Sequence, residues 1–146
     1  MAPSSSALSH DVAGLAALLA TSGLVHLVRP EVFEGIVPRM LPNRRALVYV
    51  SGVAELLCAA GLLVPATRRP AGYASAALLV AVFPANVQMS VAHGQRAQRR
   101  GDPASRVSFA ATLARLPLQV PMIRTALRAA GPGPRPGRPT PGRWSR

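Results

Sequence analysis

Long uncharged apolar runs alternate along the chain with short segments that hold the arginines and prolines. Three of these runs cover residues 12–28, 46–64 and 71–91, and Glu55 is their only charged side chain when His26 is neutral. At about 1.5 Å per residue, helices of these lengths measure roughly 26, 28 and 31 Å, close to a bilayer hydrocarbon core of about 30 Å. Their apolar residues surround the whole helix, as expected where lipid replaces water on every side. The pattern predicts three membrane-spanning helices.

A fourth apolar run, residues 109–130, is interrupted by three arginines and two prolines: Arg115, Arg124, Arg128, Pro117 and Pro121. An arginine at mid-membrane costs about 2.5–3.5 kcal/mol on insertion scales, so this run would insert poorly by itself. Beside three partner helices it could cover Arg115 and let the other arginines reach the interface. As an amphipathic helix it would instead lie on the membrane surface. Because an even number of spans closes a compact bundle, we predict a fourth span.

These runs predict an all-α fold, a four-helix transmembrane bundle followed by a disordered basic C-terminal tail. Residues 1–10 form a short polar N-terminus with no Lys or Arg, which is unlike a secretory signal peptide, so we expect the first helix to be retained. Residues 11–130 form the membrane domain, with spans at about 11–28, 46–64, 71–91 and 109–128. Residues 131–146 contain Pro, Gly and Arg without apolar periodicity, which is typical of disorder.

Three connections join the predicted spans. Residues 29–45 mix prolines with bulky apolar residues and predict a loop or short helix pressed onto the membrane face. Residues 65–70 predict a tight turn, and residues 95–106 predict a hydrophilic connection. The long connections hold four arginines each, against two in the turn and five from Arg128 onward. The positive-inside rule therefore favours neither orientation.

Composition agrees with a membrane protein, since 49% of the 146 residues are hydrophobic and only 15% are charged, against about a quarter in a typical soluble domain. The basic residues are 17 arginines and no lysine, and the net charge is +12. Such a charge also suits nucleic acid, but the arginines flank apolar runs and the tail has only Trp144 for stacking, so we expect lipid headgroups as the partner. The predicted headgroup contacts are Arg68, Arg69, Arg96, Arg99, Arg100, Arg135, Arg138 and Arg143.

Polar side chains occur inside every predicted span: His26, Glu55, Asn86, Arg115 and Gln119. Antiparallel packing puts all five in the half of the bundle next to the two longer connections, about 4 to 15 Å deep. A carboxylate at mid-bilayer must be protonated or paired, and Arg115 and Gln119 are the partners in reach. These residues predict a polar pocket for a small molecule, a quinone headgroup or a proton. A network that only fixes helix register is the alternative.

Other features of the spans concern packing and exclude several chemistries. Pro84 frees the carbonyl of Val80 and predicts a helix kink, with Asn86 placed to satisfy that carbonyl. The lone Cys58 excludes an internal disulfide and a cysteine-based zinc site. No carboxylate-rich metal cluster or catalytic motif occurs, so we expect no metal and assign no catalytic residue. Small residues spaced by four predict close helix approach: Ala13, Ala17 and Thr21, and Ala77, Ala81 and Ala85.

Four strings in the chain occur in a familiar order: HLVRPEVFEGIVPRMLP (26–42), SGVAELLCAAGLLVPATRRPAG (51–72), VFPANVQMS (82–90) and RLPLQVPMI (115–123). Together they resemble the DoxX-like family of small bacterial membrane proteins. The resemblance implies a multi-pass four-helix bundle in the cytoplasmic membrane. The matching residues are His26, Pro30, Pro38, Pro42, Gly52, Glu55, Gly61, Arg68, Pro84, Asn86, Arg115 and Gln119.

The resemblance implies little about activity. The family is named for likeness to a subunit of an archaeal thiosulfate:quinone oxidoreductase, and some relatives are linked to thiol and oxidative-stress handling. We therefore expect an accessory or binding protein with an intramembrane pocket, acting with membrane lipids and with a partner membrane subunit or a second copy. The alternatives are a membrane component of a quinone-linked oxidoreductase, with quinone as cofactor and Glu55 and His26 handling protons, and a small permease.

Overall fold

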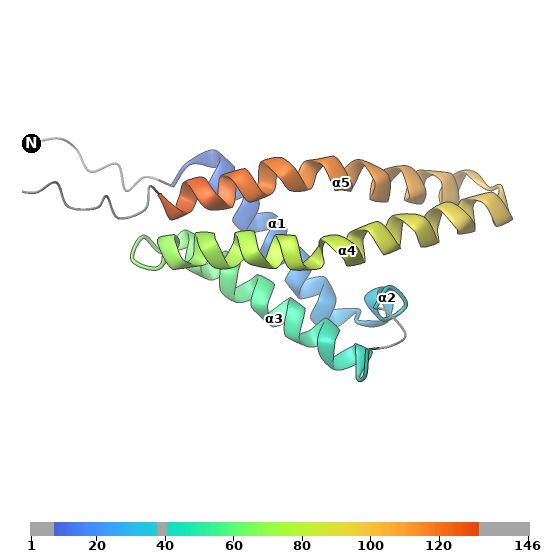
Figure 1. The fold of residues 1–146 in the computed structure, drawn as a ribbon, viewed down its shortest axis with the longest axis horizontal. Coiled ribbons are helices and arrows are strands. Elements are labelled where there is room, and N and C mark those ends of the chain that lie inside the picture. Colours follow the sequence, from blue (N-terminus) through green and yellow to red (C-terminus); the bar gives the residue numbers. More distant parts are fainter. Residues whose placement is uncertain (1–7, 38–40, 132–146) are drawn as a thin grey trace, which may run out of the picture.

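The fold is described by a computed structural model that covers residues 8–37 and 41–131, and the regular secondary structure of this part is all helical. The expected disordered tail, with Arg135, Arg138 and Arg143, lies outside the described residues. The described residues form five helices in the order shown in Figure 1: α1 (His10–Val28), α2 (Glu31–Glu34), α3 (Arg44–Leu63), α4 (Arg68–Arg100) and α5 (Pro103–Ala130).

Three of the described helices, α1, α3 and α4, are long and apolar enough to cross a membrane. Their positions agree with the three uncharged runs of the sequence. Helix α5 is long enough to cross a membrane, but it is less apolar than these three helices because its arginines lower its mean hydropathy. The described fold is therefore all-α with three apolar helices of membrane-spanning length.

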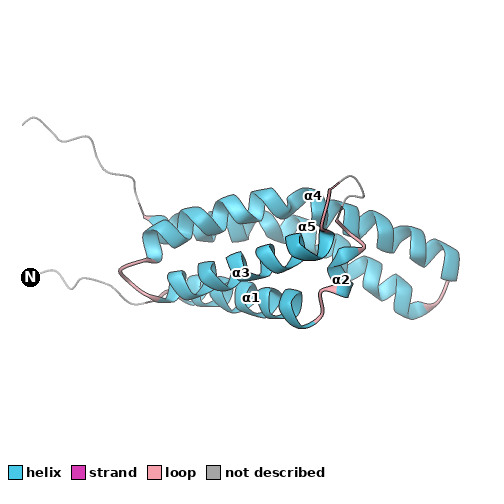
Figure 2. Cartoon of the chain, turned by 90° about the horizontal axis from the view of Figure 1, so that it is seen from below, coloured by secondary structure: helices cyan, strands magenta, loops and turns pink. Residues whose placement is uncertain are grey.

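The long helices associate as two antiparallel pairs. Helix α1 packs along α3, and α4 packs along α5, while α3 and α4 join the two pairs through the turn between them. The pairs lie close together at the end of this turn and separate towards α2 (Figures 1 and 2). The buried core at the closed end consists mainly of leucine and alanine side chains, including Leu15, Leu19, Leu62, Leu79 and Ala126.

Glycine, rather than alanine, makes the closest helix contacts. A Cβ on Gly23 would lie 2.7 Å from the carbonyl oxygen of Gly52, and a Cβ on Gly72 would lie 2.5 Å from that of Ala126. The small residues spaced by four permit close approach, but Ala17, Thr21, Ala77 and Ala81 are exposed, and Ala13 and Ala85 are only partly buried. Thr21, Ala81 and Ala85 line the cavities between the helix pairs.

The predicted hydrophilic connection over residues 95–106 is wrong in form. Helix α4 continues to Arg100, ends at Gly101 with a left-handed φ of 68°, and α5 begins at Pro103 after the N-cap Asp102. The segment from Gln95 to Arg100 is rich in glutamine and arginine, which are good helix formers. Its polar residues therefore indicate an exposed helix and not a loop. The α4–α5 hairpin extends past the end of the α1–α3 pair (Figures 1 and 2).

At the other end, the turn between α3 and α4 is shorter than predicted and is held by side chains. The Thr67 hydroxyl donates to the Gly61 carbonyl at 3.0 Å, and Arg68 Nε donates to the Leu62 carbonyl at 3.0 Å. These bonds satisfy carbonyls at the C-terminus of α3 that lack partners within the helix. The turn therefore fixes how one helix pair meets the other.

Helix α4 is unbroken at Pro84, and its axis bends in the half that follows (Figure 1). The expected partner of the Val80 carbonyl, Asn86, instead donates to Gln119 on α5. Helix α2 follows α1 after a single turn and is held near the start of α3, where Arg45 Nε lies 3.5 Å from Glu34 Oε1. This short helix matches the short element expected in residues 29–45.

Candidate functional site: a polar cavity between two helix pairs

Two adjoining cavities, of about 420 and 500 Å³, lie where the helix pairs separate. Both lie within the range of about 300–1,000 Å³ that is usual for small-molecule sites. Most of their lining is apolar. The residues common to both cavities are Phe33, Glu55, Val82, Asn86 and Arg115.

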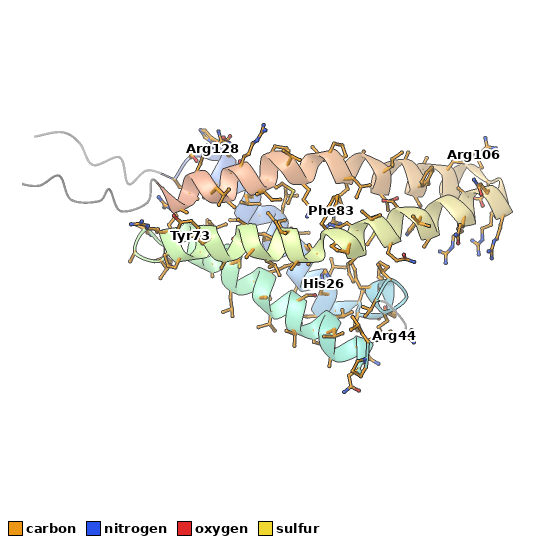
Figure 3. All side chains as sticks on the ribbon, in the orientation of Figure 1. His26, Arg44, Tyr73, Phe83, Arg106 and Arg128 are labelled. Atoms are coloured by element: carbon orange, nitrogen blue, oxygen red, sulfur yellow. The ribbon has the colours of Figure 1, made fainter. Side chains whose placement is uncertain are left out.

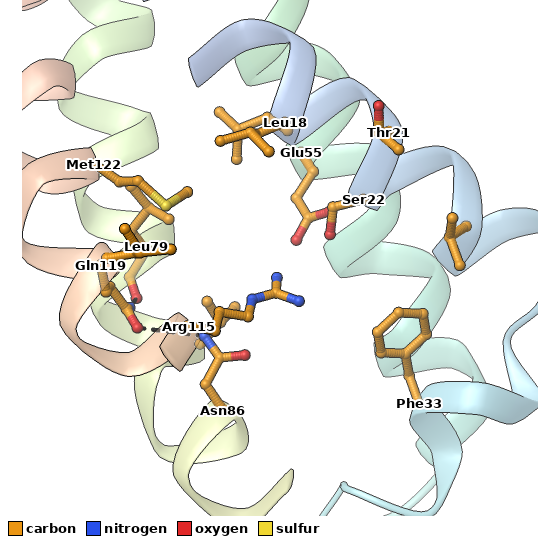
Figure 4. A pocket seen from close by; sticks show the side chains of 14 residues that line it. Leu18, Thr21, Ser22, Phe33, Glu55, Leu79, Asn86, Arg115, Gln119 and Met122 are labelled. Atoms are coloured by element: carbon orange, nitrogen blue, oxygen red, sulfur yellow. Dashed lines mark hydrogen bonds between the residues drawn. The ribbon is translucent and has the colours of Figure 1, made fainter. Parts of the chain in front are cut away.

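Glu55 is buried at the junction of α1 and α3, with 5% of its surface exposed. Its Oε2 atom lies 3.5 Å from His26 Nδ1 and accepts no hydrogen bond from the described residues. The Ser22 side chain lies beside the same carboxyl group (Figure 4). The residues nearest to Glu55 thus come from α1, one helical turn apart.

His26 is held in place by three contacts. Its Nδ1 atom lies 2.7 Å from the Ser22 carbonyl oxygen, one turn earlier in α1. The Phe33 ring stacks on the imidazole, with centroids 3.8 Å apart and an angle of 11° between the planes. A Cβ on Gly52 would lie 2.7 Å from the His26 Cβ, so only glycine lets the histidine approach α3 this closely. The imidazole is therefore oriented with Nδ1 towards α1 and Glu55.

Asn86 and Gln119 form a separate polar link between α4 and α5. Asn86 Nδ2 donates to Gln119 Oε1 at 3.3 Å, and Gln119 Nε2 donates to the Leu79 carbonyl oxygen. Gln119 is buried, and both of its polar atoms are used by α4. It is therefore occupied within its own helix pair and does not serve as the expected partner of Glu55.

Arg115 projects from α5 into the space that the two cavities share, with its guanidinium pointing towards the α1–α3 pair (Figure 4). Within the described residues it forms no hydrogen bond, and no carboxylate lies within 4.0 Å of it. The expected Glu55–Arg115 pair is thus two opposite charges that face one cavity without direct contact.

The structure brings the five predicted pocket residues to one region, but as two groups. His26 and Glu55 belong to the α1–α3 pair, Asn86 and Gln119 belong to the α4–α5 pair, and Arg115 points from the second group towards the first. Such a cavity offers a donor fork on one wall and a carboxylate on the other, so it suits a ligand that bears an acceptor or negative group. His26 Nδ1 donates to the Ser22 carbonyl oxygen, and the same atom lies 3.5 Å from Glu55 Oε2, so the imidazole and the carboxyl group share one wall of the cavity.

Two residues of the site, Ser22 and Phe33, were absent from the sequence prediction. Ser22 precedes His26 by four residues, which places both on one face of α1, and this spacing could have identified it. Phe33 lies in the connection after α1, where no periodicity indicates which way an aromatic side chain turns. Stacking on His26 makes it the wall of both cavities at the end near α2.

The predicted headgroup arginines occupy two ends of the molecule. Arg69 is exposed at the start of α4, and Arg96, Arg99 and Arg100 are exposed on its last turns. Figure 3 shows the two ends, marked by Arg106 at the α4–α5 hairpin and by Arg128 near the end of α5. Arg68 differs from the other described arginines of this set because it donates to carbonyls of α3.

Few metal-binding side chains come together in the part of the chain that the structure describes. No three of its His, Cys, Asp and Glu residues form a group that could hold a metal ion. Cys58, 7% exposed, is packed in the core with Leu15 and Leu62 rather than in the cavity. The polar chemistry of the site is therefore that of one imidazole, one carboxylate and one guanidinium.

The fold and the site define a class of protein. Its described part is helical, with three helices long and apolar enough to cross a membrane and a cavity with polar groups between two helix pairs. The chain belongs to the family described as Domain of unknown function (DUF8561), whose model matches residues 15–130. This range contains every residue from the four long helices that lines the cavity. No curated protein and no solved structure matches the chain.

Proposed function

We propose that the chain is a multi-pass cytoplasmic membrane protein of the DoxX-like kind, in which α5 completes a four-helix transmembrane bundle. Helix α5 packs along α4 and carries exposed apolar side chains outside the cavity: Leu113, Val120 and Leu127. Arg115, whose charge would oppose insertion, points into the cavity and not towards lipid. These two features support a span in place of a surface helix.

Within this bundle, we propose an accessory binding function. The cavity holds a lipid-like or quinone-like molecule, either in this chain alone or beside a partner membrane subunit or second copy. The observation that carries this proposal is that Arg115 and Glu55 face the same largely apolar cavity from opposite sides and do not contact each other. Charged groups in low-dielectric surroundings need partners, and a bound polar headgroup would supply one.

The proposal is tested by the content of the purified protein. The full chain is purified in a mild detergent, and its organic extract is analysed by mass spectrometry for lipids and quinones. Glu55→Gln is expected to change the bound amount several-fold without changing the unfolding midpoint, with a decrease for a neutral headgroup and an increase for an acidic one. Glu31→Gln, the same substitution at an exposed position of α2, is the matched control and should retain the ligand.

Two outcomes would contradict a binding function. One is a wild-type protein that contains no such molecule and binds none when it is added. The other is a Glu55→Gln protein that no longer folds, since the carboxylate would then serve helix register alone. Either result would contradict the binding function and would not bear on the proposed four-helix membrane architecture of the wild-type protein.

A second candidate, supported by the 3.5 Å approach of His26 to Glu55, is the membrane component of a quinone-linked oxidoreductase. These two groups could pass a proton to or from a quinone in the cavity, while a partner subunit carries out thiosulfate or thiol oxidation. A buried Cys58 offers no thiol to the cavity, so such oxidation requires that partner. Deletion of the gene should then change thiosulfate or thiol oxidation by membranes, and His26→Gln should reproduce the change.

Lipid headgroups remain the proposed partners of the exposed arginines. An arginine near an anionic membrane surface contributes about 1 kcal/mol to binding. Arg69 is placed to do so at the closed end of the bundle. The arginines of the α4–α5 hairpin stand several residues beyond the last apolar turn of α4.

A further inference from the structure

The chemistry of the cavity narrows the class of ligand. We propose that the cavity selects a single-chain amphiphile with an acidic headgroup, a carboxylate or phosphate monoester, which binds the Arg115 guanidinium while its chain follows the apolar wall towards Leu18 and Met122. This inference rests on the proposed binding function and adds the charge, the chain number and the orientation of the ligand.

The first argument is the balance of charge around the cavity. The titratable groups that line it are His26 from α1, Glu55 from α3 and Arg115 from α5, and α4 contributes only neutral polar groups. Glu55 lies against α1, with His26 Nδ1 at 3.5 Å and Ser22 beside it. Arg115 has no such neighbour among the described residues, so the cation is the group left to be neutralised by a ligand.

The second argument is the geometry of the donor. A guanidinium presents its N–H groups as a planar fork, which fits the two oxygens of a carboxylate or phosphate better than a single carbonyl oxygen. Nearby, Asn86 Nδ2 and both amide atoms of Gln119 are already hydrogen-bonded within the α4–α5 pair. The headgroup is therefore bound chiefly by Arg115.

The third argument concerns the chain. The smaller cavity is apolar on the side of Arg115 where Leu18 and Met122 lie (Figure 4). Leu118 also lines this cavity. Met122 lies seven residues after Arg115, about 10 Å along α5. Leu18 and Leu118 are each 57% exposed and come from α1 and α5, which make few contacts with each other. This side of the cavity opens between these helices, so an acyl chain can enter from the lipid.

The size of the cavity limits the number of chains. The cavity on the α1–α5 side has a volume of about 420 Å³, and both Leu18 and Leu118 line it. A space of this size suits one acyl chain, whereas a second chain would have to separate α1 from α5. Free fatty acids and lysophospholipids with a phosphate monoester are the two sources of this chemistry.

The test uses the full chain in dodecyl maltoside and calorimetric titration with four probes. Oleate and oleoyl lysophosphatidic acid carry the acidic group, monoolein has the same chain without charge, and decylubiquinone represents the quinone class. Both acids, or one of them, should bind at least about tenfold more tightly than monoolein, a difference of about 1.4 kcal/mol. Binding by one acid alone identifies the carboxylate or the phosphate as its source.

Arg115→Gln should remove this preference, while Arg124→Gln, an exposed arginine of α5 outside the cavity, should retain it. If Arg115→Gln does not fold, Arg115→Lys keeps the charge and should retain the preference for acids. Leu118→Trp narrows the side opening and should weaken all acyl probes alike.

Binding of both acids no tighter than that of monoolein, or a preference for decylubiquinone, would overturn the acidic ligand and leave the binding function standing. No binding by any of the four probes would overturn both. An acid preference that persists in Arg115→Gln would place the acid elsewhere and also contradict the inference. The two proposals therefore fail in different ways.

Discussion

Replacing Gly72 by alanine tests the contact on which the α4–α5 pair depends. A Cβ at this position would lie 2.5 Å from the Ala126 carbonyl oxygen, 2.7 Å from the Ala130 nitrogen and 3.1 Å from the Ala130 Cα. Ordinary contact begins at 3.4 Å, so the closest atom is 0.9 Å too near. All three atoms belong to the backbone of α5 and cannot rotate away. The helix itself must therefore move.

The magnitude follows from comparison with a second glycine. Gly14 lies inside α1, and a Cβ added there would have no neighbour within 4 Å, so Gly14→Ala changes helix propensity without a clash. Alanine in place of a mid-helix glycine stabilises a helix by about 0.5–1 kcal/mol. Overpacking against a fixed neighbour costs about 1–3 kcal/mol. The two variants make the same chemical change, so Gly72→Ala should be less stable than Gly14→Ala by about that overpacking cost.

The free energy of unfolding is measured in mixed micelles by titration with sodium dodecyl sulfate, with helicity followed by circular dichroism. The midpoint should rise slightly or stay unchanged for Gly14→Ala and should fall for Gly72→Ala. Equal midpoints for the two variants would mean that α4 and α5 do not cross at Gly72. Such a result would also remove the main support for α5 as a span.

Three further predictions concern the hairpin and the polar link. Asp102 accepts a hydrogen bond from the N–H of Ser105, which holds the pKa of the Asp102 carboxyl below its ordinary value. The stabilisation by ionised Asp102 is therefore complete above the ordinary pKa and is lost as the pH falls through the lowered pKa. Asp102→Ala should lower the unfolding midpoint at neutral pH and make no difference in strong acid. Gln119→Leu removes the link to α4 and leaves the Asn86 amide without its partner, and it should lower the unfolding free energy by about 1–3 kcal/mol, measured in the same micelles; an unchanged midpoint would contradict the link. In a Cys58→Ser background, Arg100→Cys should react rapidly with a membrane-impermeant maleimide from one side of sealed vesicles, and no labelling from either side would show that the hairpin does not reach water.

The hydropathy pattern predicts the long apolar helices well because lipid imposes a length and an all-round apolar surface on any helix that crosses it. It fails at the α4–α5 hairpin, where polarity led to the prediction of a connection. Between Gln95 and Arg100 the residues favour helix, and the partner of this part of α4 is α5, whose Phe109 packs against Gly94. Hydropathy indicates whether a segment faces water or lipid. It does not indicate whether a polar segment is a helix or a loop, which also depends on its contacts with other helices.

The sequence predicts which polar residues come together better than it predicts their contacts. Depth along an antiparallel bundle follows from counting residues, and this count brings Glu55, Arg115 and Gln119 to similar levels. Rotation of each helix about its axis decides which of them touch, and counting residues does not measure it. In the structure Gln119 turns towards α4, and Glu55 turns towards α1, where His26 lies 3.5 Å away.

The two ends of the molecule differ in how the helix pairs are joined, and this difference explains why a cavity forms at all. At the closed end, α3 and α4 approach until a Cβ on Gly61 would lie 2.7 Å from that of Ala71, and Asp11 on α1 meets Arg128 on α5 at 3.3 Å. Towards α2 no comparable contact joins the pairs in the described residues, although each pair stays tightly packed within itself. A ligand between the pairs therefore needs to change only the angle at which they meet. Such a ligand breaks no contact within either pair, so its binding does not oppose the packing of α1 on α3 or of α4 on α5.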